Sequence, residues 1–486
     1  MADETFEVVV VGAGLSGVGA GCHFAQRRPA MRYVVLESRE RIGGTWDLFR
    51  YPGIRSDSDM FTLGFGFKPW RSPNAIAGGA EIRAYIEEAA REYGVDKHIR
   101  FGCKVARADW SSKASRWTVE VADRAGGLET YSAKFLLLAA GYYRYEAGHT
   151  PEFLGIADFR GEVVHPQQWT EQIAYAGKKV LVIGSGATAV TLVPALAEQA
   201  AHVTMLQRSP TYIGPRPSAD PIADALRKRL PERAAYALNR WRSVLRGQYL
   251  FWLCKRYPAR VRKLLADAAY AYLGADYDVG KHFTPRYNPW DQRLCLAPDG
   301  DFYLAIRKGR ADVVTDEIET FTEYGVRLKS GEEISADLVV TATGLELQSF
   351  GGIKLSVDGA ALEPGALTTY RGYMYAGVPN LASIFGYVNA SWTLRADLIS
   401  EQVCRLLTHM ERRDYASCTP RLDSAPAQHE NWEGFSSGYF ARAQGRFPKQ
   451  GAREPWRLNQ NYLKDWFSAR IGRLEDGVLQ FASNRT

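Results

Sequence analysis

Glycine residues occur twice in this chain at a spacing that lets the backbone approach a phosphate group. Gly12, Gly14 and Gly17 follow the apolar run 6–11 and open a helix-like stretch. In such a set the first glycine permits a tight turn, the second admits a pyrophosphate and the third lets helix and strand pack closely. Free N–H groups at the start of the helix would hold the phosphates. The pattern predicts a dinucleotide site that includes Gly12, Gly14, Ser16 and Gly17.

An acidic residue stands where the ribose of such a dinucleotide would lie. Glu37 follows Gly17 by about twenty residues, at the end of the next apolar run. A carboxylate at this position accepts hydrogen bonds from both ribose hydroxyls. A purely structural turn is the alternative, but strand, helix and acid are all in register, which favours the nucleotide site.

The second glycine set carries a basic residue instead. Gly184, Gly186 and Ala189 repeat the pattern, and Arg208 ends the following strand with Ser209 beside it. A guanidinium with a neighbouring hydroxyl attracts a ribose 2′-phosphate, which an acid would repel. This site is therefore predicted to prefer NADPH to NADH, the alternative being an ordinary surface arginine. The predicted residues are Gly184, Ser185, Gly186, Ala187, Thr188, Ala189, Arg208 and Ser209.

Two nucleotide sites in one chain indicate electron transfer between two cofactors. The usual pair is a flavin that accepts hydride and a nicotinamide that donates it, here FAD at the first site and NADPH at the second. Disulfide reductases share this arrangement but need a redox cysteine pair near the flavin. The six cysteines show no paired spacing. Molecular oxygen is therefore the expected electron acceptor.

The elements that must position these residues follow from the apolar pattern. Segments 6–37 and 178–208 are predicted as βαβ units, and short strands are expected at 135–140 and 338–343. Between 222 and 272 the apolar spacing becomes helical, which predicts a helical insertion. Pro231 and Pro258 stand where new helices can begin. The helical spacing is carried by Ile222, Leu226, Leu230, Ala234, Leu238, Trp241 and Leu245.

These patterns predict an α/β protein with two Rossmann-like dinucleotide-binding domains and a helical insertion. The stretch after Cys418 is rich in Pro, Gly and Arg and is expected to be irregular and to wrap over the body. The net charge of +7 is too diffuse to indicate nucleic acid. The acidic N-terminus lacks the features of a signal peptide, no apolar run is long enough to span a bilayer, and no cysteine cluster indicates a metal, so a cytoplasmic protein is expected.

A fingerprint lies between the two βαβ units. Phe159, Gly161, His165 and Trp169 occupy the fixed positions of FxGxxxHxxxW. This segment resembles the fingerprint of the Baeyer–Villiger monooxygenases, flavoenzymes that insert oxygen beside a ketone. The departure is Thr170, where the family pattern usually has Pro or Asp. The resemblance implies that His165 serves domain linkage rather than chemistry.

The resemblance extends over nearly the whole chain. The segments 43–60, 183–197, 287–296 and 386–398 are similar to the ethionamide-activating (ethionamide monooxygenase) branch of the family. This implies an FAD-binding domain over residues 1–147 and 346–486. It also implies an NADP-binding domain over 148–212 and 288–345, with the helical insertion at 213–287.

The resemblance also assigns candidate site residues. Arg293 resembles the essential active-site arginine of the family, and Asp57 resembles the carboxylate near flavin and nicotinamide. Val105 resembles the residue whose backbone meets the adenine. The alternatives without a role in the reaction are that Asp57 caps a helix and that Arg293 is an ordinary surface cation. The segments resembling the flavin lining contain Gly44, Thr45, Trp46, Asp47, Arg55, Ser56 and Asp57.

The implied activity converts ketones to esters or lactones through a C4a-peroxyflavin, using NADPH and oxygen. Arg293 would hold the peroxide anion and Asp57 would orient Arg293. Thioethers and thioamides are further expected substrates. The substrate pocket would be lined partly by the helical insertion and the segment around Trp392. The alternative within enzymes is a flavin-containing S- or N-monooxygenase, which typically lacks the tryptophan found here at Trp169.

An alternative of another class concerns the helical insertion. Residues 222–272 carry many Arg and Lys with few acids, and amphipathic basic helices can bind an anionic membrane or a partner. The favoured interpretation is a solvated basic face over a packed helical insertion.

Overall fold

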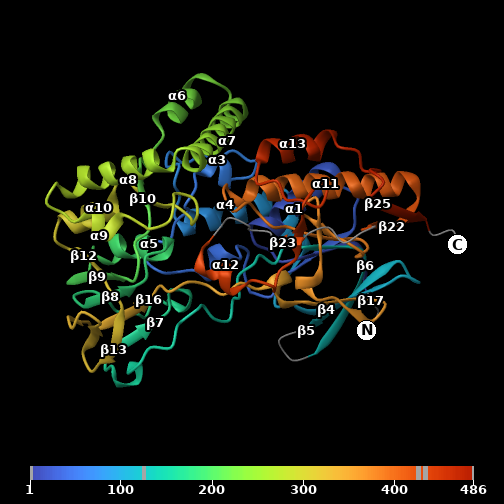
Figure 1. Ribbon diagram of the computed structural model, residues 1–486. Helices are drawn as coiled ribbons and strands as arrows, with labels where there is room; N and C mark the ends of the chain where they lie inside the picture. Colours follow the sequence, from blue (N-terminus) through green and yellow to red (C-terminus); the bar gives the residue numbers. More distant parts are fainter. Residues whose placement is uncertain (1–3, 123–126, 423–427, 431–435, 484–486) are drawn as a thin grey trace.

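The computed structural model describes residues 4–122, 127–422, 428–430 and 436–483. Two sheets, each with a parallel core, lie side by side, and helices cover both of them (Figure 1). Two Rossmann-like units and a helical insertion are present, so the predicted fold class is confirmed. The predicted absence of a signal peptide concerns the first residues of the chain, of which 1–3 lie outside the described residues.

The first sheet is built on the predicted N-terminal βαβ unit. Strand β1 pairs in parallel with β2 on one side and with β6 on the other, and helix α1 connects β1 to β2. Fully buried valines fill the centre of β1, as expected of a strand covered on both faces. The strands of this sheet are β18 (Ala360–Ala361), β17 (Lys354–Val357), β4 (Lys104–Ser111), β5 (Arg116–Ala122), β6 (Leu128–Leu138), β1 (Glu4–Val11), β2 (Tyr33–Leu36) and β3 (Ile99–Arg100), with β21 (Leu381–Ser383) beside β6.

The second sheet repeats this arrangement with the second βαβ unit. Strands β8 and β9 are parallel neighbours joined by α5, and β16 lies on the other side of β8. The strand order is β12 (Ala311–Thr315), β9 (His202–Gln207), β8 (Lys179–Ile183), β16 (Leu338–Thr341) and β7 (Glu162–Val164). Both βαβ units are thus confirmed, and β16 confirms the strand predicted at 338–343. The strand predicted at 135–140 is the end of the eleven-residue strand β6, which stops at Leu138.

Helices cover the sheets. Helix α1 packs against α11, and α10 packs against α5 and α8. The α-helices besides α6, α7 and α8 are α1 (Leu15–Arg27), α2 (Thr45–Leu48), α3 (Met60–Leu63), α4 (Gly79–Glu92), α5 (Ala187–Leu196), α9 (Val279–Phe283), α10 (Asp301–Arg307), α11 (Trp392–Arg413), α12 (Gly438–Arg442) and α13 (Tyr462–Ile471). Smaller sheets pair β10 (Ile213–Arg216) with β11 (Cys295–Pro298), β13 (Ile318–Thr322) with β14 (Gly325–Leu328) and β15 (Glu333–Ser335), β19 (Thr369–Tyr370) with β20 (Met374–Tyr375), β22 (Tyr415–Pro420) with β25 (Leu479–Ser483), and β23 (Gln428–Glu430) with β24 (Lys449–Gly451).

The helical insertion is present and begins its helices at the predicted prolines. Helix α6 (Pro221–Arg229) is capped by Asp220, α7 (Glu232–Arg256) follows Pro231, and α8 (Pro258–Leu273) starts on Pro258. Figure 1 shows α6 and α7 projecting from one end of the molecule. The structure places most of the predicted apolar stripe on the outside, since Ile222, Leu230, Leu238 and Leu245 are all exposed.

The expectation of an irregular C-terminus is wrong for much of the described part. Helix α13 forms because the Asn461 side chain accepts from the N–H groups of Leu463 and Lys464 and so caps it. The α13 helix then packs on α11, and β25 pairs with β22. Of the described helices, none is long and apolar enough to cross a membrane.

Candidate functional site

The first glycine turn is held at the end of β1 by close backbone contacts. Gly12 has φ of +103°, and a Cβ added there would lie 2.7 Å from the carbonyl oxygen of Ala139. A Cβ at Gly17 would lie 1.8 Å from the carbonyl oxygen of Gly12, so only glycine lets α1 approach the turn. Gly14 precedes α1 and no side chain caps this helix. Its first N–H groups are therefore available to an anion.

Glu37 lies beside this turn at the end of β2. The Ala13 N–H donates to its Oε2 at 2.6 Å, and the Arg39 N–H donates to its Oε1 at 2.8 Å. The carboxylate is buried, and its remaining lone pairs can accept from hydroxyl groups. Strand β4 begins next to it, because the Cys103 N–H donates to the Glu37 carbonyl. Val105, two residues further along β4, is buried in the same region.

The Gly43–Gly44 segment closes over the first turn. Gly44 has φ of +56°, and a Cβ there would lie 3.0 Å from the Gly14 Cα. Helix α2 then begins at Thr45 with Trp46, both partly buried. The Tyr145 hydroxyl would lie 3.3 Å from a Cβ at Gly44, and burial raises the pKa of Tyr145 to about 12. The contact places this tyrosine at the turn.

Asp47 forms the centre of an arginine cluster. Arg39 Nη2 donates to its carboxylate at 2.6 Å and Arg50 Nη2 at 3.0 Å, while Arg83 Nη1 lies 3.4 Å away. Burial alone would raise the pKa of Asp47, but the hydrogen bond and charge of Arg39, helped by Arg50 and Arg83, hold it below its ordinary value. The carboxylate is thus occupied by protein groups and fixes the position of three cations near Gly44.

Arg293 and Asp57 form an ion pair, although they are 236 positions apart in the sequence. Arg293 Nη1 donates to Asp57 Oδ2 at 2.8 Å, and both side chains are about one-third exposed. Asp57 raises the pKa of Arg293, partial burial opposes the shift, and the hydroxyl of Tyr439 adds to it. The guanidinium therefore stays charged at any pH at which the protein is folded. Its remaining N–H groups can stabilise a negatively charged oxygen.

A group of aromatic side chains lies near this ion pair, since the charge of Arg293 acts to lower the pKa of Tyr142 and of Tyr143. The Tyr142 and Tyr143 hydroxyls lie 2.7 Å apart, and the Tyr142 ring stacks on Trp392 at 4.9 Å between centroids. Trp392 Nε1 donates to Ser16 Oγ at 2.8 Å, which ties the aromatic group to the first turn. Burial raises the pKa of Tyr142, so its hydroxyl remains protonated. The pocket segment expected around Trp392 therefore lies at the first nucleotide turn.

Sequence reasoning missed Tyr142, Tyr143 and Tyr439. The first two follow directly after β6, where the ends of parallel strands bring binding groups together, so the Tyr-Tyr pair was an available signal. Tyr439 belongs to α12, in the C-terminal stretch that was expected to be irregular. Nothing in its local sequence indicates the contact with Arg293.

Arg55 and Ser56 are engaged by protein groups. Arg55 forms an ion pair with Asp301 at the start of α10, across the boundary between the two sheets. Ser56 is buried, and its Oγ accepts from the Ala77 N–H at 3.3 Å. Asp59, close by, pairs with Arg216 at 3.0 Å and caps α3. These contacts hold Asp57 in place from both sides.

The second glycine turn is more open than the first. Gly184 has φ of +130°, and a Cβ there would lie 2.3 Å from the Ala342 carbonyl oxygen. Gly186 precedes α5 without a side-chain cap, and a Cβ at Gly186 would meet nothing within 4 Å. Gly186 and Ala187 are exposed, and Ala189 packs into the core in the place of a third glycine. An anion can therefore reach this turn from solvent.

Arg208 and Ser209 lie against the second turn. The Ser185 hydroxyl donates to the Ser209 carbonyl at 2.9 Å, which fixes the end of β9 beside the glycines. Arg208 is exposed directly after this strand, and Thr188 follows within the first turn of α5. The cation and the turn thus face solvent together.

The fingerprint residues lie where the two units are joined. His165 Nδ1 accepts from the Gln167 N–H, and its Nε2 lies 3.1 Å from the Gly344 carbonyl oxygen. A Cβ at Gly148 would clash with the His165 ring at 2.0 Å. Both chain segments that cross between the sheets therefore contact this histidine.

The other fingerprint residues are structural in their contacts. The ring of Phe159 packs against Phe321 at 6.0 Å, and a Cβ at Gly161 would lie 2.4 Å from the Phe159 ring. Trp169 is buried and meets Tyr175 edge to face. No fingerprint side chain contacts Arg293 or Asp57 among the described residues.

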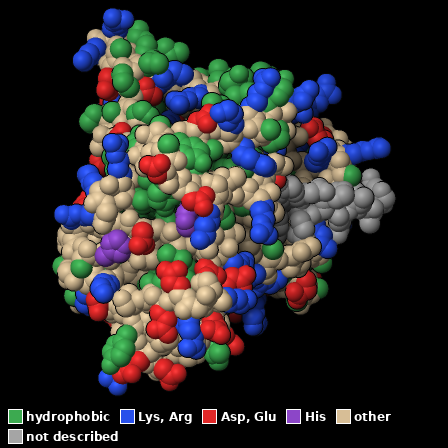
Figure 2. Space-filling view, turned by 60° about the vertical axis from the view of Figure 1, so that its left-hand side comes forward, with side chains coloured by type: hydrophobic (Ala, Val, Ile, Leu, Met, Phe, Trp, Pro, Cys, Tyr) green, Lys and Arg blue, Asp and Glu red, His purple; other side chains and the backbone are tan. Residues whose placement is uncertain are grey.

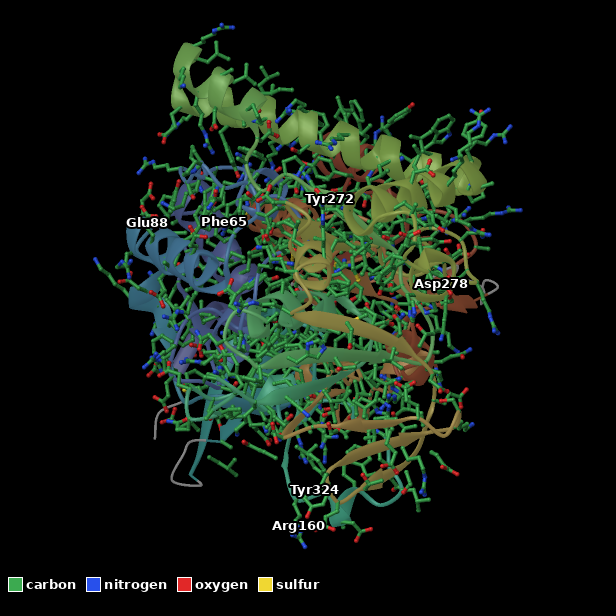
Figure 3. The ribbon with its side chains drawn as sticks, turned by 90° about the vertical axis from the view of Figure 1, so that its left-hand side faces the viewer. Phe65, Glu88, Arg160, Tyr272, Asp278 and Tyr324 are labelled. Carbon is green, nitrogen blue, oxygen red and sulfur yellow. The ribbon has the colours of Figure 1, made fainter. Side chains whose placement is uncertain are left out.

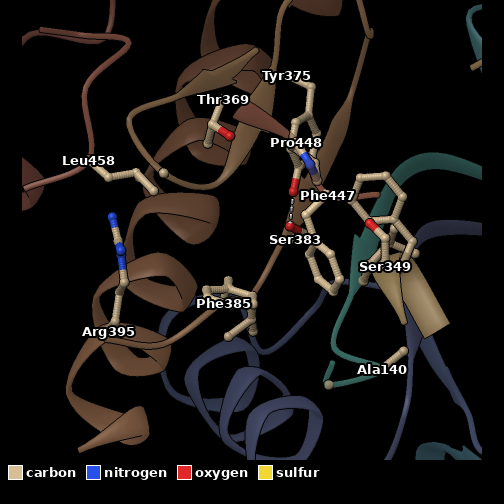
Figure 4. Close-up of a pocket in the computed structure, with 15 residues that line it drawn as sticks. Ala140, Ser349, Thr369, Tyr375, Ser383, Phe385, Arg395, Phe447, Pro448 and Leu458 are labelled. Carbon is tan, nitrogen blue, oxygen red and sulfur yellow. Dashed lines mark hydrogen bonds between the residues drawn. The ribbon is translucent and has the colours of Figure 1, made fainter. Parts of the chain in front are cut away.

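A small cavity of about 40 Å³ lies behind the aromatic group (Figure 4). Ala140, Phe385 and the buried Arg395 line it, and the hydroxyls of Ser349 and Thr369 there have no hydrogen-bond partner among the residues that the structure describes. Its volume suits one or a few water molecules but is far below the roughly 300 Å³ that a small-molecule site requires. The cavity is therefore not a cofactor site.

The six cysteines of this chain are free thiols. All six cysteines are described and none forms a disulfide. Burial raises the pKa of Cys295, the cysteine nearest in sequence to Arg293, to about 12, so it is not a thiolate at neutral pH. No cluster of three His, Cys, Asp or Glu side chains suited to a metal is found in the ranges that the structure describes.

Known proteins of similar sequence match the chain over its whole length. It is 51% identical over 480 residues to the FAD-containing monooxygenase EthA of Mycobacterium tuberculosis, covering 99% of this chain and 98% of the relative. The probable FAD-binding monooxygenase AlmA of Acinetobacter baylyi is 47% identical over 481 residues, covering 99% and 96%. The chain belongs to the FAD-containing monooxygenases. The family resemblance noted in the sequence is thereby confirmed.

Two further comparisons agree with the fold of this monooxygenase. A family model described as pyridine nucleotide-disulphide oxidoreductase matches residues 9–233. The structure of oxidised steroid monooxygenase bound to NADP has a TM-score of 0.77 at 22% identity, covering 99% of this chain and 100% of that one. The open structure of cyclohexanone monooxygenase has a TM-score of 0.74 at 20% identity with the same coverage. At these identities the two structures support the fold alone.

Proposed function

We propose that this FAD-containing monooxygenase is a Baeyer–Villiger enzyme that uses NADPH and oxygen to convert ketones to esters or lactones. One oxygen atom enters the bond beside the carbonyl carbon and the other leaves as water. NADPH supplies the two electrons as a hydride, and one proton is consumed. FAD, when bound and reduced, supplies the activation of oxygen.

The observation that carries the proposal is the Arg293–Asp57 ion pair. A nucleophilic oxygen must stay deprotonated to attack a ketone, and a cation held beside it lowers its pKa. Arg293 can then stabilise the oxyanion that forms when the carbonyl carbon becomes tetrahedral. The hydrogen bond of 2.8 Å from Arg293 Nη1 to Asp57 Oδ2 fixes the orientation of the guanidinium before the reaction begins.

The residues at the first turn fit FAD. The uncapped start of α1 offers N–H groups to a pyrophosphate, and the buried Glu37 carboxylate keeps acceptor capacity for ribose hydroxyls. Closure of Gly44 over Gly14 suits a cofactor that stays bound. Asp47 would support the FAD site by fixing the positions of its three arginine partners. Ser56 would support it by bonding to the Ala77 N–H and so fixing the segment that contains Asp57. The proposed FAD residues are Gly12, Gly14, Ser16, Gly17, Glu37, Gly44, Thr45, Trp46, Asp47, Arg55, Ser56, Asp57 and Val105.

The open second turn suits a cofactor that exchanges, as NADPH must in each cycle. Arg208 would contact the 2′-phosphate and Ser209 would add a hydroxyl donor. Gly184 and Gly186 allow the backbone approach, and the adjoining Ser185, Ala187, Thr188 and Ala189 start the helix that faces the pyrophosphate.

The same proposal includes the domain boundaries. FAD would bind to 1–147 with 346–486 and NADP to 148–212 with 288–345, while 213–287 forms the helical insertion. In support, strands β1–β6 belong to one sheet and β7–β9 with β12 and β16 to the other. His165 would link the domains by its contacts near Gly148 and Gly344.

Sulfur oxidation at the same site is part of the proposal. A protonated oxidant is electrophilic, so thioethers and thioamides become substrates without any further residue. The alternative is a flavin-containing S- or N-monooxygenase that does not attack ketones. The purified enzyme should be given NADPH, ¹⁸O₂ and either a ketone or a thioether, and the products analysed by mass spectrometry. An ester carrying one ¹⁸O is expected, whereas S-oxide without any ester would favour the alternative and overturn the assignment.

A further inference from the structure

Helix α7 turns its apolar side toward solvent. Leu238, Leu245, Tyr249 and Trp252 are 49–60% exposed, and their spacing places them in one stripe along the helix. Nearby on the insertion, Ile222, Leu230, Leu250, Leu264 and Tyr270 are exposed as well. A continuous exposed stripe of this kind marks an interaction surface, unlike single exposed apolar residues.

The opposite side of α7 is attached to the body by polar contacts. Arg240 is buried, pairs with Asp397 at 3.0 Å and donates to the carbonyls of Phe61 and Gly64. Asn239 is fully buried beside it. Tyr236 and Val244 are buried on this inner side as well, so α7 packs on the body through one side and carries a second apolar stripe on its outer side, which is polar in the usual surface helix. The outward stripe therefore is not needed for packing within this chain.

The positive charge of the chain is concentrated on the same helices. Residues 221–273 contain 12 Lys and Arg against three Asp and Glu, a net charge of +9, while the whole chain carries +7. The remainder of the protein is thus slightly negative. Figure 2 shows basic and hydrophobic side chains intermingled along the projecting end that α6 and α7 form.

Several of these cations are unpaired. The insertion's surface ion pairs use Arg227, Arg242, Lys255 and Lys263. Within the part of the chain that the structure describes, Arg246, Arg256 and Arg260 have no carboxylate partner. Arg256 and Arg260 instead lie over the Tyr257 ring, at 5.0 and 5.2 Å from its centroid.

Aromatic rings complete the corner between α7 and α8. Trp252 stacks near Tyr249 at 5.8 Å and meets Tyr257 edge to face at 5.7 Å. Trp and Tyr combine an apolar ring with a polar group, a composition suited to the boundary between lipid and water. Arginine stems add apolar surface while keeping the charge exposed.

We propose that this surface, formed by the outward side of α7 with the α7–α8 corner, docks on anionic lipid bilayers. Apolar side chains would enter the headgroup boundary while unpaired cations meet lipid phosphates. A second copy of the chain fits less well, because docking stripe to stripe would bring together two helical insertions, each with a net charge of +9 over residues 221–273. The surface continues onto α13, where Phe467 and Ile471 are exposed and Trp466 meets Trp241 of α7.

Docking would also bring lipid close to the Arg293 site. Phe251 of α7 meets Trp290 edge to face at 5.9 Å, and Lys255 pairs with Asp291 at 2.8 Å. Trp290 and Asp291 lie three and two positions before Arg293 in the chain. An apolar substrate dissolved in the bilayer would therefore approach the site beside α7.

The test is sedimentation of the purified, flavin-loaded protein with vesicles. Neutral phosphatidylcholine vesicles are compared with vesicles that also contain phosphatidylglycerol, at about 0.1 M and about 1 M salt. Binding to the anionic vesicles that weakens at high salt is expected. Absence of binding to anionic vesicles at low salt would overturn the proposal.

Matched variants separate the apolar and the charged contributions. Leu245→Ser should weaken binding about tenfold, whereas Leu154→Ser should not, although Leu154 is 74% exposed. The Leu154 carbonyl accepts from the N–H of Phe321, which is three residues from Tyr324 in the chain. Figure 3 places Tyr324 at the end of the molecule opposite α7. Equal effects of the two serine variants would contradict docking through α7.

The charge variants follow the same design. Arg246→Gln combined with Arg256→Gln should weaken binding about 25-fold, because the loss of each positive charge should weaken it about fivefold. Arg160→Gln with Arg327→Gln removes the same net charge and should leave binding unchanged, because Figure 3 places Arg160 at the end opposite α7 and Arg327 lies on β14, three residues from Tyr324 at that end. Each variant should retain flavin absorbance and unfolding temperature. A concentration-dependent dimer that buries Trp252, seen by light scattering and fluorescence, would identify a second copy as the occupant and overturn the proposal.

Discussion

Asp57 controls Arg293 through one charged hydrogen bond. In Asp57→Asn the shape of the side chain is kept but the negative charge is lost, so Arg293 is held less firmly and its pKa falls. Because a hydrogen bond to a charged group contributes about 1.5–3 kcal/mol, ester formation should slow about 10- to 100-fold. The ratio of ester formed to NADPH consumed measures this loss directly.

Asp59 offers the control for this variant two residues away. Asp59→Asn breaks a similar ion pair with Arg216, while an asparagine can still cap α3. It should lower the unfolding temperature and reduce the ester-to-NADPH ratio much less than Asp57→Asn does, because the charged hydrogen bond between Asp57 and Arg293 is kept. A ratio that falls equally in both variants would mean that Asp57 acts only on the stability of the segment.

Arg208 sets the choice of nicotinamide. In Arg208→Gln the predicted contact with the 2′-phosphate is lost, so kcat/KM for NADPH should fall about 10- to 100-fold while that for NADH changes little. Steady-state kinetics with both nucleotides measures the two values. Arg307→Gln, at an exposed arginine on α10, serves as the matched control. An unchanged preference in Arg208→Gln would remove this residue from the site.

At the scale of the elements, the glycine turns, the βαβ units and the insertion were predictable because their signals are local. Gly12 and Gly184 need positive φ, and the apolar runs around them have the length of buried strands. The orientation of α7 was not predictable, since helical spacing shows that a stripe exists but not which side the rest of the chain covers. The buried Arg240, which decides that orientation, finds its partner Asp397 only in the folded chain.

The linker elements depend on the protonation of His165. Burial lowers the pKa of His165, partly opposed by its bond to the Gly344 carbonyl, so the folded state favours the neutral ring. In the unfolded chain a histidine titrates near about 6.5. Its contribution to stability is therefore complete above that pH and is lost as the pH falls below it, because the unfolded state then binds the extra proton.

His165→Asn tests this contribution. Asparagine can still accept from the Gln167 N–H but cannot reach Gly344, so the free energy of unfolding should fall by about 1–3 kcal/mol at neutral pH. The difference from wild type should shrink between about pH 7.5 and about pH 5.5, followed by denaturant unfolding. The half-buried His202, which pairs with Asp312 and lies away from the linker, is changed to Asn as the control. A difference that grows at low pH would contradict the assignment.

At the scale of the whole molecule, the site assembles from segments that the sequence keeps apart. Asp57, Tyr142, Arg293 and Tyr439 come from four different stretches, yet Arg293 pairs with Asp57 and lies near enough to both tyrosines to interact with them electrostatically. Resemblance to known monooxygenases predicted Asp57 and Arg293 and the orientation of one by the other, but the tyrosines near them required the fold. The uneven charge, with the insertion strongly positive and the remainder slightly negative, also becomes meaningful only once α7 is seen to project.

The most direct test of the proposed function is the yield of ester per NADPH consumed in Arg293→Ala. FAD should remain bound and NADPH should still be oxidised, because Arg293 belongs to neither glycine turn. Ester formation should fall at least about 100-fold, with the electrons appearing as hydrogen peroxide. Arg286→Ala, at an exposed arginine nearby in the sequence, should match wild type. An undiminished yield of ester per NADPH in Arg293→Ala would contradict the central role given to this residue.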